Sequence, residues 1–278
     1  MPSRPKLVAP PGACDTHMHF YDPRYPTAPT ALMAGPAWAN VAAYREVQAR
    51  LGLGRVVIVQ PTTYGTDNGP TLDAMAAIGA AARAIAVVDR DVADAELERL
   101  TKLGCRGARF QIRPGGAIPW EDVERIAAKV AAFGWHAQVQ MNGRLFAERA
   151  AVLRRLPCEV VIDHLGLFMD PVPVDHPAFR AVLAMLDAGR CWVKLSGPYE
   201  SSKAGPPDWV DVRPLARAFA KHAPERMLWA SDWPHPSRKE PPDDAALLDL
   251  LLDWVDDDAT RARILVDNPA KLYGFPPA

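Results

Sequence analysis

Three features are missing from this sequence, and each absence excludes a class of protein. No stretch approaches the roughly 18 consecutive apolar residues that a membrane-spanning helix needs. The N-terminal segment has no apolar core before its first histidine, so we expect neither a signal peptide nor a membrane anchor. Dense runs of Lys or Arg are absent, and 32 basic against 33 acidic residues give a net charge of -1. This balance argues against a nucleic-acid partner.

Cysteine is also scarce. The four cysteines are widely separated, form no CxxC pair, and lie in or beside apolar strand-like runs; they are Cys14, Cys105, Cys158 and Cys191. This pattern is typical of reduced cysteines in a protein core. Together with the missing signal segment, it favours a cytoplasmic location.

The sequence does contain a repeated unit, in which a short apolar run is followed by a polar turn and a longer segment of helical period. Such runs predict strands at 13–19, 56–61, 84–89, 107–112, 136–141, 160–165, 191–197 and 227–233. Amphipathic segments between them predict helices at 40–52, 72–84, 93–104, 121–134 and 176–189. Eight alternations favour a closed parallel (β/α)8 TIM barrel over an open sheet. No linker or composition shift divides the chain, so we expect a single domain over residues 1–278.

Glycine and proline mark several helix ends. Glycines that suit a left-handed residue after the last helical turn follow four of the predicted helices, at Gly52, Gly104, Gly134 and Gly189. Residues 243–255 predict a further helix. The last helix is expected to begin with Asn268 as its N-cap and Pro269 at its first position.

Two proline-rich segments follow the first and seventh predicted strands, at 26–36 and 196–209. In a barrel both would lie at the C-terminal mouth. They are candidate lid loops, and simple surface connections are the alternative.

Polar residues collect where the predicted strands end, which is where a parallel barrel places its active site. Burying so many polar groups is costly unless they are paired, bind an ion or serve a site. His17 and His19 alternate on the first strand, so their rings should project to the same face, at positions roughly 6–7 Å apart along the strand axis. His164 ends the sixth strand and Asp232 the eighth. We predict that these four residues form the catalytic centre.

Other polar residues near the strand ends are candidate substrate-binding residues. They are Gln60, Arg109, Arg113, Gln140, Lys194, Ser196, Tyr199 and His235. His235 follows Asp232 closely and could orient it or contact the substrate. His136 begins the fifth strand, and His176 and His222 lie in or near helices, so these three are assigned no role.

These motifs resemble the amidohydrolase superfamily, in its branch of lactonases like 2-pyrone-4,6-dicarboxylate lactonase. The resemblance covers nearly the whole chain and rests on PPGACDTHMHFYDP, VVIDHLG, WVKLSGPYESS and LWASDWPHP, in that order and spacing. The proline-rich start of the chain and the motif YESS resemble the D-galactarolactone isomerase of the same branch even more closely. The resemblance implies that His17, His19 and His164 are the histidines of strands one and six, and that Asp232 is the aspartate that activates water.

The chain departs from the family pattern at positions that bear on metal binding. Strand four has Arg109 and Gln111 where many members carry a bridging Lys or Glu, and strand five has Gln140 where a metal-ligating His is expected. These departures argue against a two-metal centre. The four residues of the catalytic centre could hold one Zn²⁺ with an open position, and a metal-free site is equally open.

A further departure bears on the substrate. The motif DHLGL has Leu167 where the pyrone lactonase uses an Arg to hold a carboxylate. Arg109, helped by Arg113 and Lys194, could still bind one carboxylate through its fork of N–H donors. A sugar-acid or monocarboxylate lactone therefore fits better than the pyrone dicarboxylate.

Hydrolysis is the leading hypothesis for the reaction. Asp232 would take a proton from a water molecule, free or metal-bound, that attacks the lactone carbonyl. The isomerase carries Gln and Asn where His17 and Asp232 stand here, so it lacks this base. Lactone isomerisation, decarboxylation as in related barrels, and a non-catalytic binding role on a hydrolase scaffold are the alternatives. The expected partner is a small lactone, and the sequence does not specify an oligomeric state.

Overall fold

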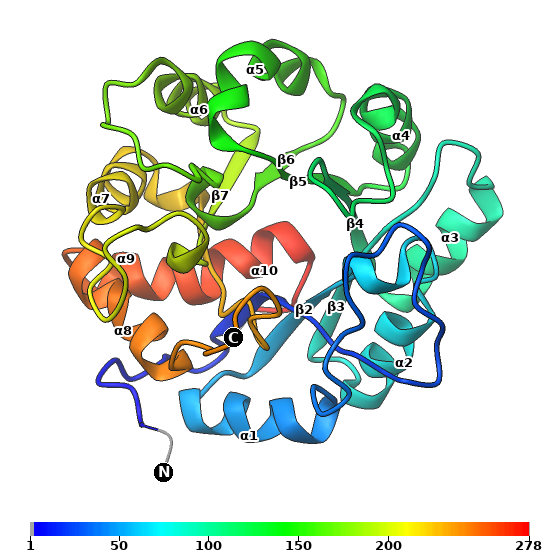
Figure 1. The fold of residues 1–278 in the computed structure, drawn as a ribbon, viewed down its shortest axis with the longest axis horizontal. Coiled ribbons are helices and arrows are strands. Elements are labelled where there is room, and N and C mark those ends of the chain that lie inside the picture. The colour runs from blue at the N-terminus through cyan, green and yellow to red at the C-terminus, as the bar shows by residue number, and fades with distance from the viewer. Residues whose placement is uncertain (1–2, 278) are drawn as a thin grey trace.

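The protein is an eight-stranded parallel barrel surrounded by helices (Figure 1), in a computed structural model that describes residues 3–277. The strands neighbour one another in sequence order. A parallel bridge between Met18 and Trp233 brings the first and last strands together, so the barrel is nearly closed. The predicted (β/α)8 barrel is thereby confirmed. The strands are β1 (Cys14–Met18), β2 (Arg55–Val59), β3 (Ala82–Ala86), β4 (Cys105–Gln111), β5 (His136–Gln140), β6 (Val160–Ile162), β7 (Cys191–Leu195) and β8 (Met227–Trp229).

The helices that follow the strands pack around the outside of the barrel and bury apolar residues against it, whereas the short α9 buries none. None of the helices within residues 3–277 is both long and apolar enough to cross a membrane. The helices are α1 (Val41–Leu51), α2 (Gly69–Ile78), α3 (Asp94–Leu103), α4 (Val123–Ala131), α5 (Phe146–Arg155), α6 (Pro177–Asp187), α7 (Arg213–His222), α8 (Asp244–Trp254), α9 (Asp258–Ala262) and α10 (Asn268–Tyr273).

Most helix ends agree with the sequence prediction, and the differences have local causes. The four glycines predicted after helices all have positive φ. The predicted helix at 72–84 is too long, because Gly79, with φ 86°, ends α2 and the chain then enters β3. Asn268 is not an N-cap, because the π-helical turn η7 (Arg263–Asp267) leads directly into α10. Its side-chain amide instead donates to the carbonyls of Pro224 and Met227.

The C-terminal segment closes the bottom of the barrel. Helix α10 lies across the centre of the ring of strands in Figure 1. Tyr273 and Phe275 pack against Cys14 and Trp192 in a buried cluster inside the strands. All four cysteines are buried and free, as expected. The polar residues that end the strands lie at the opposite end of the barrel.

A single carboxylate joins β1 to the segment after β8. Asp15 accepts hydrogen bonds from the backbone N–H and the hydroxyl of Ser231, at 3.0 and 2.5 Å. It also accepts from the N–H of His17 at 3.1 Å and from the Tyr44 hydroxyl at 2.9 Å. Asp15 therefore fixes the two chain segments that carry the predicted catalytic residues.

Candidate active site

The four predicted catalytic residues meet at the C-terminal end of the barrel. One carboxylate oxygen of Asp232, Oδ1, lies 3.6 Å from Nε2 of His19, 3.7 Å from Nε2 of His17 and 3.8 Å from Nε2 of His164. The ring centroids of His17 and His19 are 4.9 Å apart. All four side chains are buried.

Left-handed backbone positions just beyond the strands aim two of these side chains. Asp232 has φ 63° and His164 has φ 51°, a conformation that costs of order 1–3 kcal/mol in a residue other than glycine. The N–H of Asp232 donates to the carbonyl of His17 at 2.9 Å, which ties it to β1. Gly197 leaves room for His164, because a Cβ there would lie 2.8 Å from its Nδ1.

Each histidine is held through Nδ1 and presents Nε2 to Asp232. Nδ1 of His19 is 2.7 Å from the carbonyl oxygen of Val59, which can only accept. Neutral His19 therefore carries its proton on Nδ1, and its Nε2 is an unprotonated acceptor. Nδ1 of His164 lies 3.0 Å from the hydroxyl of Ser196.

Two charged residues of opposite sign, Asp163 and Lys194, lie behind the ring of His17. Its Nδ1 lies 3.2 Å from Oδ1 of Asp163 and 3.3 Å from Nζ of Lys194. Lys194 is wholly buried and also donates to Gln138 at 2.8 Å, while its Nζ lies 3.3 Å from Asp163. This buried ion pair fixes the ring of His17 from below.

Burial and charge set the protonation of the centre. Burial, reinforced by the charge of Lys194, holds the pKa of His17 well below its usual range, and burial likewise lowers the pKa of His19. Burial alone would raise the pKa of Asp232, but the facing histidines, His164 first, outweigh it and the net shift is well downward. At neutral pH the centre thus presents the carboxylate of Asp232 to the neutral rings of His17 and His19.

This arrangement fits one metal ion. His17, His164 and Asp232 offer ligand atoms that all lie within 4.8 Å of one another, and His19 lies outside that group of three. Nε2 of His17 is buried without a hydrogen-bond partner among the described residues. A carboxylate facing two imidazole nitrogens is a donor set that suits a divalent ion, with a position left open.

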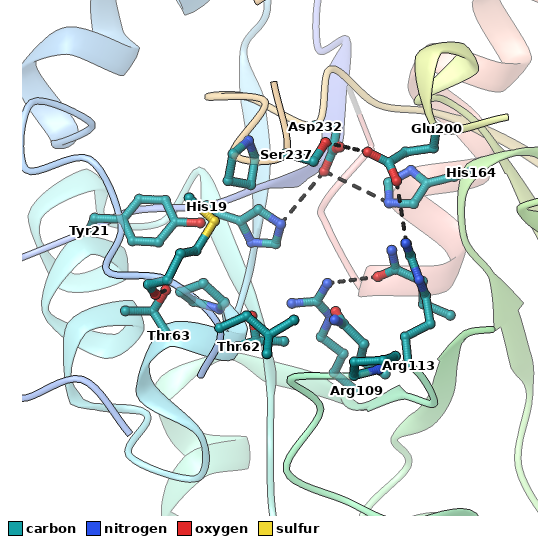
Figure 2. Close-up of a pocket in the computed structure, with 17 residues that line it drawn as sticks. His19, Tyr21, Thr62, Thr63, Arg109, Arg113, His164, Glu200, Asp232 and Ser237 are labelled. Carbon is teal, nitrogen blue, oxygen red and sulfur yellow. Dashed lines mark hydrogen bonds and ion pairs between the residues drawn. The ribbon is translucent and has the colours of Figure 1, made fainter. Parts of the chain in front are cut away.

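A cavity of about 190 Å³ opens above the centre (Figure 2). His19, His164 and Asp232 form its base, and Arg109 points into it from β4. Leu32 and Met33 of the segment 26–36, and Glu200 of the segment 196–209, also line it. Both predicted lid segments therefore border the cavity.

Three of the predicted substrate-binding residues line this cavity: Arg109, Arg113 and Gln140. Arg109 donates to the carbonyl of Gln60 at 2.6 Å and to Oε1 of Gln140 at 2.8 Å. Arg113 pairs with Glu200 at 3.3 Å. Glu200 also accepts a hydrogen bond from Ser237 (Figure 2).

The other predicted substrate-binding residues lie outside the cavity lining, and each supports a residue of the site. The Gln60 side chain donates to the carbonyls of Gly65 and Asp67 and so braces a loop. Lys194 lies beneath His17 and Ser196 behind His164. Tyr199 and His235 lie behind Asp232.

Sequence reasoning did not select Asp163 or Glu200. Asp163 directly precedes His164 at a strand end, so the same strand-end signal could have found it. Glu200 lies in the short helix η5 (Pro198–Glu200) beyond β7, and no pattern in the sequence indicates that it pairs with Arg113.

Comparison with known proteins agrees with this geometry. The family described as amidohydrolase matches residues 14–275. The chain belongs to the amidohydrolase family. It is 37% identical to D-galactarolactone isomerase of Agrobacterium fabrum, over 98% of this chain and 94% of that protein. It is 35% identical to 2-pyrone-4,6-dicarboxylate hydrolase of Comamonas testosteroni, over 98% and 93%.

Solved structures of this family share the fold. A crystal structure of an Agrobacterium tumefaciens protein, 37% identical, matches with a TM-score of 0.94 and covers 99% of this chain and 100% of that one. The predicted superfamily and branch are confirmed by these relatives, which act on lactones by hydrolysis or by isomerisation.

Proposed function

We propose that this protein is a lactonase in which Asp232 is the general base. Asp232 accepts a proton from water as the water oxygen bonds to the lactone carbonyl carbon. The ring C–O bond then breaks, and Asp232 returns the proton to the leaving oxygen. The observation that carries this proposal is the ionised, buried carboxylate whose Oδ1 lies among three imidazole nitrogens at the base of the cavity.

His19 supports the base by holding the attacking water. Its Nε2 is an acceptor at the edge of the cavity, 3.6 Å from Oδ1 of Asp232. A water between these two atoms would donate one hydrogen to each and turn its lone pairs toward the substrate.

A divalent ion, where present, would be held by His17, His164 and Asp232, and would supply Lewis-acid polarisation of the carbonyl. His17 and His164 keep the nitrogens that face Asp232 in place through their contacts with Asp163 and Ser196.

The charges of the cavity support a substrate with a single carboxylate. Arg109 has no carboxylate partner among the described residues, so its guanidinium is free to bind one through paired N–H donors. Arg113 is already paired with Glu200, so its charge is not free to hold a second substrate carboxylate. This balance favours a hydroxylated monocarboxylate lactone, such as a sugar-acid lactone.

Replacing the base tests the proposal. Asp232→Asn should abolish turnover across a panel of aldono-, aldaro- and muconolactones while the thermal unfolding temperature stays near that of the wild type. Asp91→Asn, at an exposed carboxylate outside the cavity, is the matched control. A variant at position 232 that keeps the wild-type rate would rule out Asp232 as the base.

Lactone isomerisation is the second candidate, favoured by the 37% identity to an isomerase. There a substrate hydroxyl, in place of water, attacks the carbonyl. Turnover in ¹⁸O-water separates the two, because hydrolysis places the label in the product acid and isomerisation does not.

A further inference from the structure

The second carboxylate oxygen of Asp232 has one close partner, on the side away from the histidines. The Tyr199 hydroxyl donates to Oδ2 at 2.6 Å. Oδ1 is the oxygen that faces the three Nε2 atoms at 3.6–3.8 Å. The two oxygens of the proposed base therefore have different partners, with the tyrosine on Oδ2 and the histidines on Oδ1.

Tyr199 is itself held by a continuous chain of contacts that leads outward. Its hydroxyl lies 2.9 Å from Nδ1 of His235, and Nε2 of His235 lies 2.9 Å from Oδ1 of Asp244. Oδ2 of Asp244, the first residue of α8, accepts from Arg50 of α1 at 3.0 Å. The chain runs from the centre of the barrel to its outer helices, and Tyr199 and His235 are almost wholly buried.

Because Asp232 is a carboxylate, the single proton of the Tyr199 phenol sets the direction of the hydrogen bonds on both sides of it. A phenol has one proton, so Tyr199 that donates to Oδ2 can only accept from His235. Nδ1 of His235 then donates to the tyrosine oxygen at 2.9 Å, and its Nε2 faces Oδ1 of Asp244 at 2.9 Å. The tyrosine oxygen therefore has a partner on each side, and these contacts hold it within reach of Oδ2 of Asp232.

We propose that Tyr199, held by His235 and Asp244, is a positioning residue that locks Oδ2 of Asp232 and so keeps Oδ1 directed at the histidines and the cavity. This inference rests on the proposed role of Asp232 as the base. The terminal torsion of an aspartate is broad and roughly two-fold, so an unanchored carboxylate would rotate freely. Tyr199 and His235, which lie outside the cavity lining, act on the reaction through Asp232.

Tyr199→Phe removes the hydroxyl and keeps the ring that packs against Trp209 and His235. We expect kcat to fall about 10–100-fold with KM nearly unchanged, since supporting contacts of this kind typically cost that much. Tyr25→Phe is the matched control, because it loses a 2.8 Å hydrogen bond to Asp73 outside the cavity. Its kcat should equal that of the wild type. A Tyr199→Phe enzyme with wild-type kcat, or with a raised KM alone, overturns the proposal.

Two variants of Asp244 separate positioning from a simple loss of stability. Asp244→Asn keeps an amide of the same size that can either accept from or donate to Nε2 of His235, so it should retain most of the activity. Asp244→Ala removes the acceptor and should lower kcat toward the Tyr199→Phe value. Equal activity losses in the two Asp244 variants, at equal thermal unfolding temperatures, would contradict positioning by this contact.

A crystal structure of Tyr199→Phe tests the inference without any assay of turnover. The carboxylate of Asp232 should rotate so that Oδ1 no longer faces all three Nε2 atoms. An unmoved carboxylate refutes the positioning role even if the variant is slow. A wild-type enzyme that opens no lactone refutes the proposed function, and the carboxylate orientation in the crystal still decides on Tyr199.

Discussion

The imidazole of His136, on the floor of the barrel, makes the stability of the protein depend on pH. It packs against Tyr273 and fills the space beside Gly107, and its Nε2 is buried with no partner among the described residues. Burial, reinforced by the charge of Lys194, lowers the pKa of His136 from 6.5 to about 3. Between these values the unfolded chain binds a proton at this ring and the folded chain does not. The free energy of unfolding is therefore highest above pH 6.5 and falls as the pH is lowered toward 3.

The size of the effect follows from the two pKa values. Well below pH 6.5 the loss is about 1.4 kcal/mol per pH unit, which amounts to about 2 kcal/mol between pH 6.5 and pH 4.5 and about 4 kcal/mol between pH 6.5 and pH 3. His136→Gln removes the titrating ring and keeps a polar side chain. Urea unfolding followed by tryptophan fluorescence should show that the wild type loses about 2 kcal/mol more than this variant over the first interval. Equal losses in the two proteins would refute the idea that a buried neutral imidazole is responsible.

Four further outcomes are expected. Lys194→Met should lower the free energy of unfolding by about 3–5 kcal/mol, because Asp163 stays buried without its cation; a loss below about 1 kcal/mol in urea unfolding would contradict this. Arg109→Lys should raise KM about tenfold with little change in kcat, because lysine lacks the fork that binds a carboxylate, and an unchanged KM would place the carboxylate elsewhere. Gly143→Ala should cost about 1–3 kcal/mol in thermal unfolding, since a Cβ would lie 2.4 Å from the carbonyl of Gly166, and wild-type stability would refute that contact. Zinc added to chelator-treated protein should bind in one equivalent by mass spectrometry, and His17→Ala should abolish that binding; two equivalents would contradict the single site.

The barrel could be predicted because its strands are buried on both faces and read as short apolar runs. Helix boundaries were less predictable. The alanine-rich stretch 72–84 has no polar break, so only the backbone at Gly79 shows where the helix ends and β3 begins. The sequence analysis did not give bounds for α5 and α7, although the buried residues Leu215, Ala216, Phe219 and Ala220 of α7 recur at helical spacing. Asn268 and Pro269 look like a helix start in sequence, although a π-helical turn precedes them.

The residues of the centre could be predicted from the sequence, but the position of each supporting side chain relative to it could not. His17 and Asp232 come together because the ends of parallel strands converge at one edge of the barrel. Lys194 and Tyr199 also lie near the end of a strand, but one lies beneath the histidines and the other behind the base. Lys194 lies within β7 and Tyr199 in η5 beyond it, and the apolar pattern of the sequence does not show where the strand ends between them.

The junction made by Asp15 has a consequence for how the enzyme acquires its activity. Asp15 and Ser231 are 216 positions apart in the chain, and the proposed base is the next residue after Ser231. Contacts so distant in sequence form late, because the entropy of closing the intervening chain must first be overcome. A chain with seven strands in place therefore has its helices but no assembled centre. During refolding, catalytic activity should return after the helical circular dichroism signal, and its recovery would time the closing of the barrel.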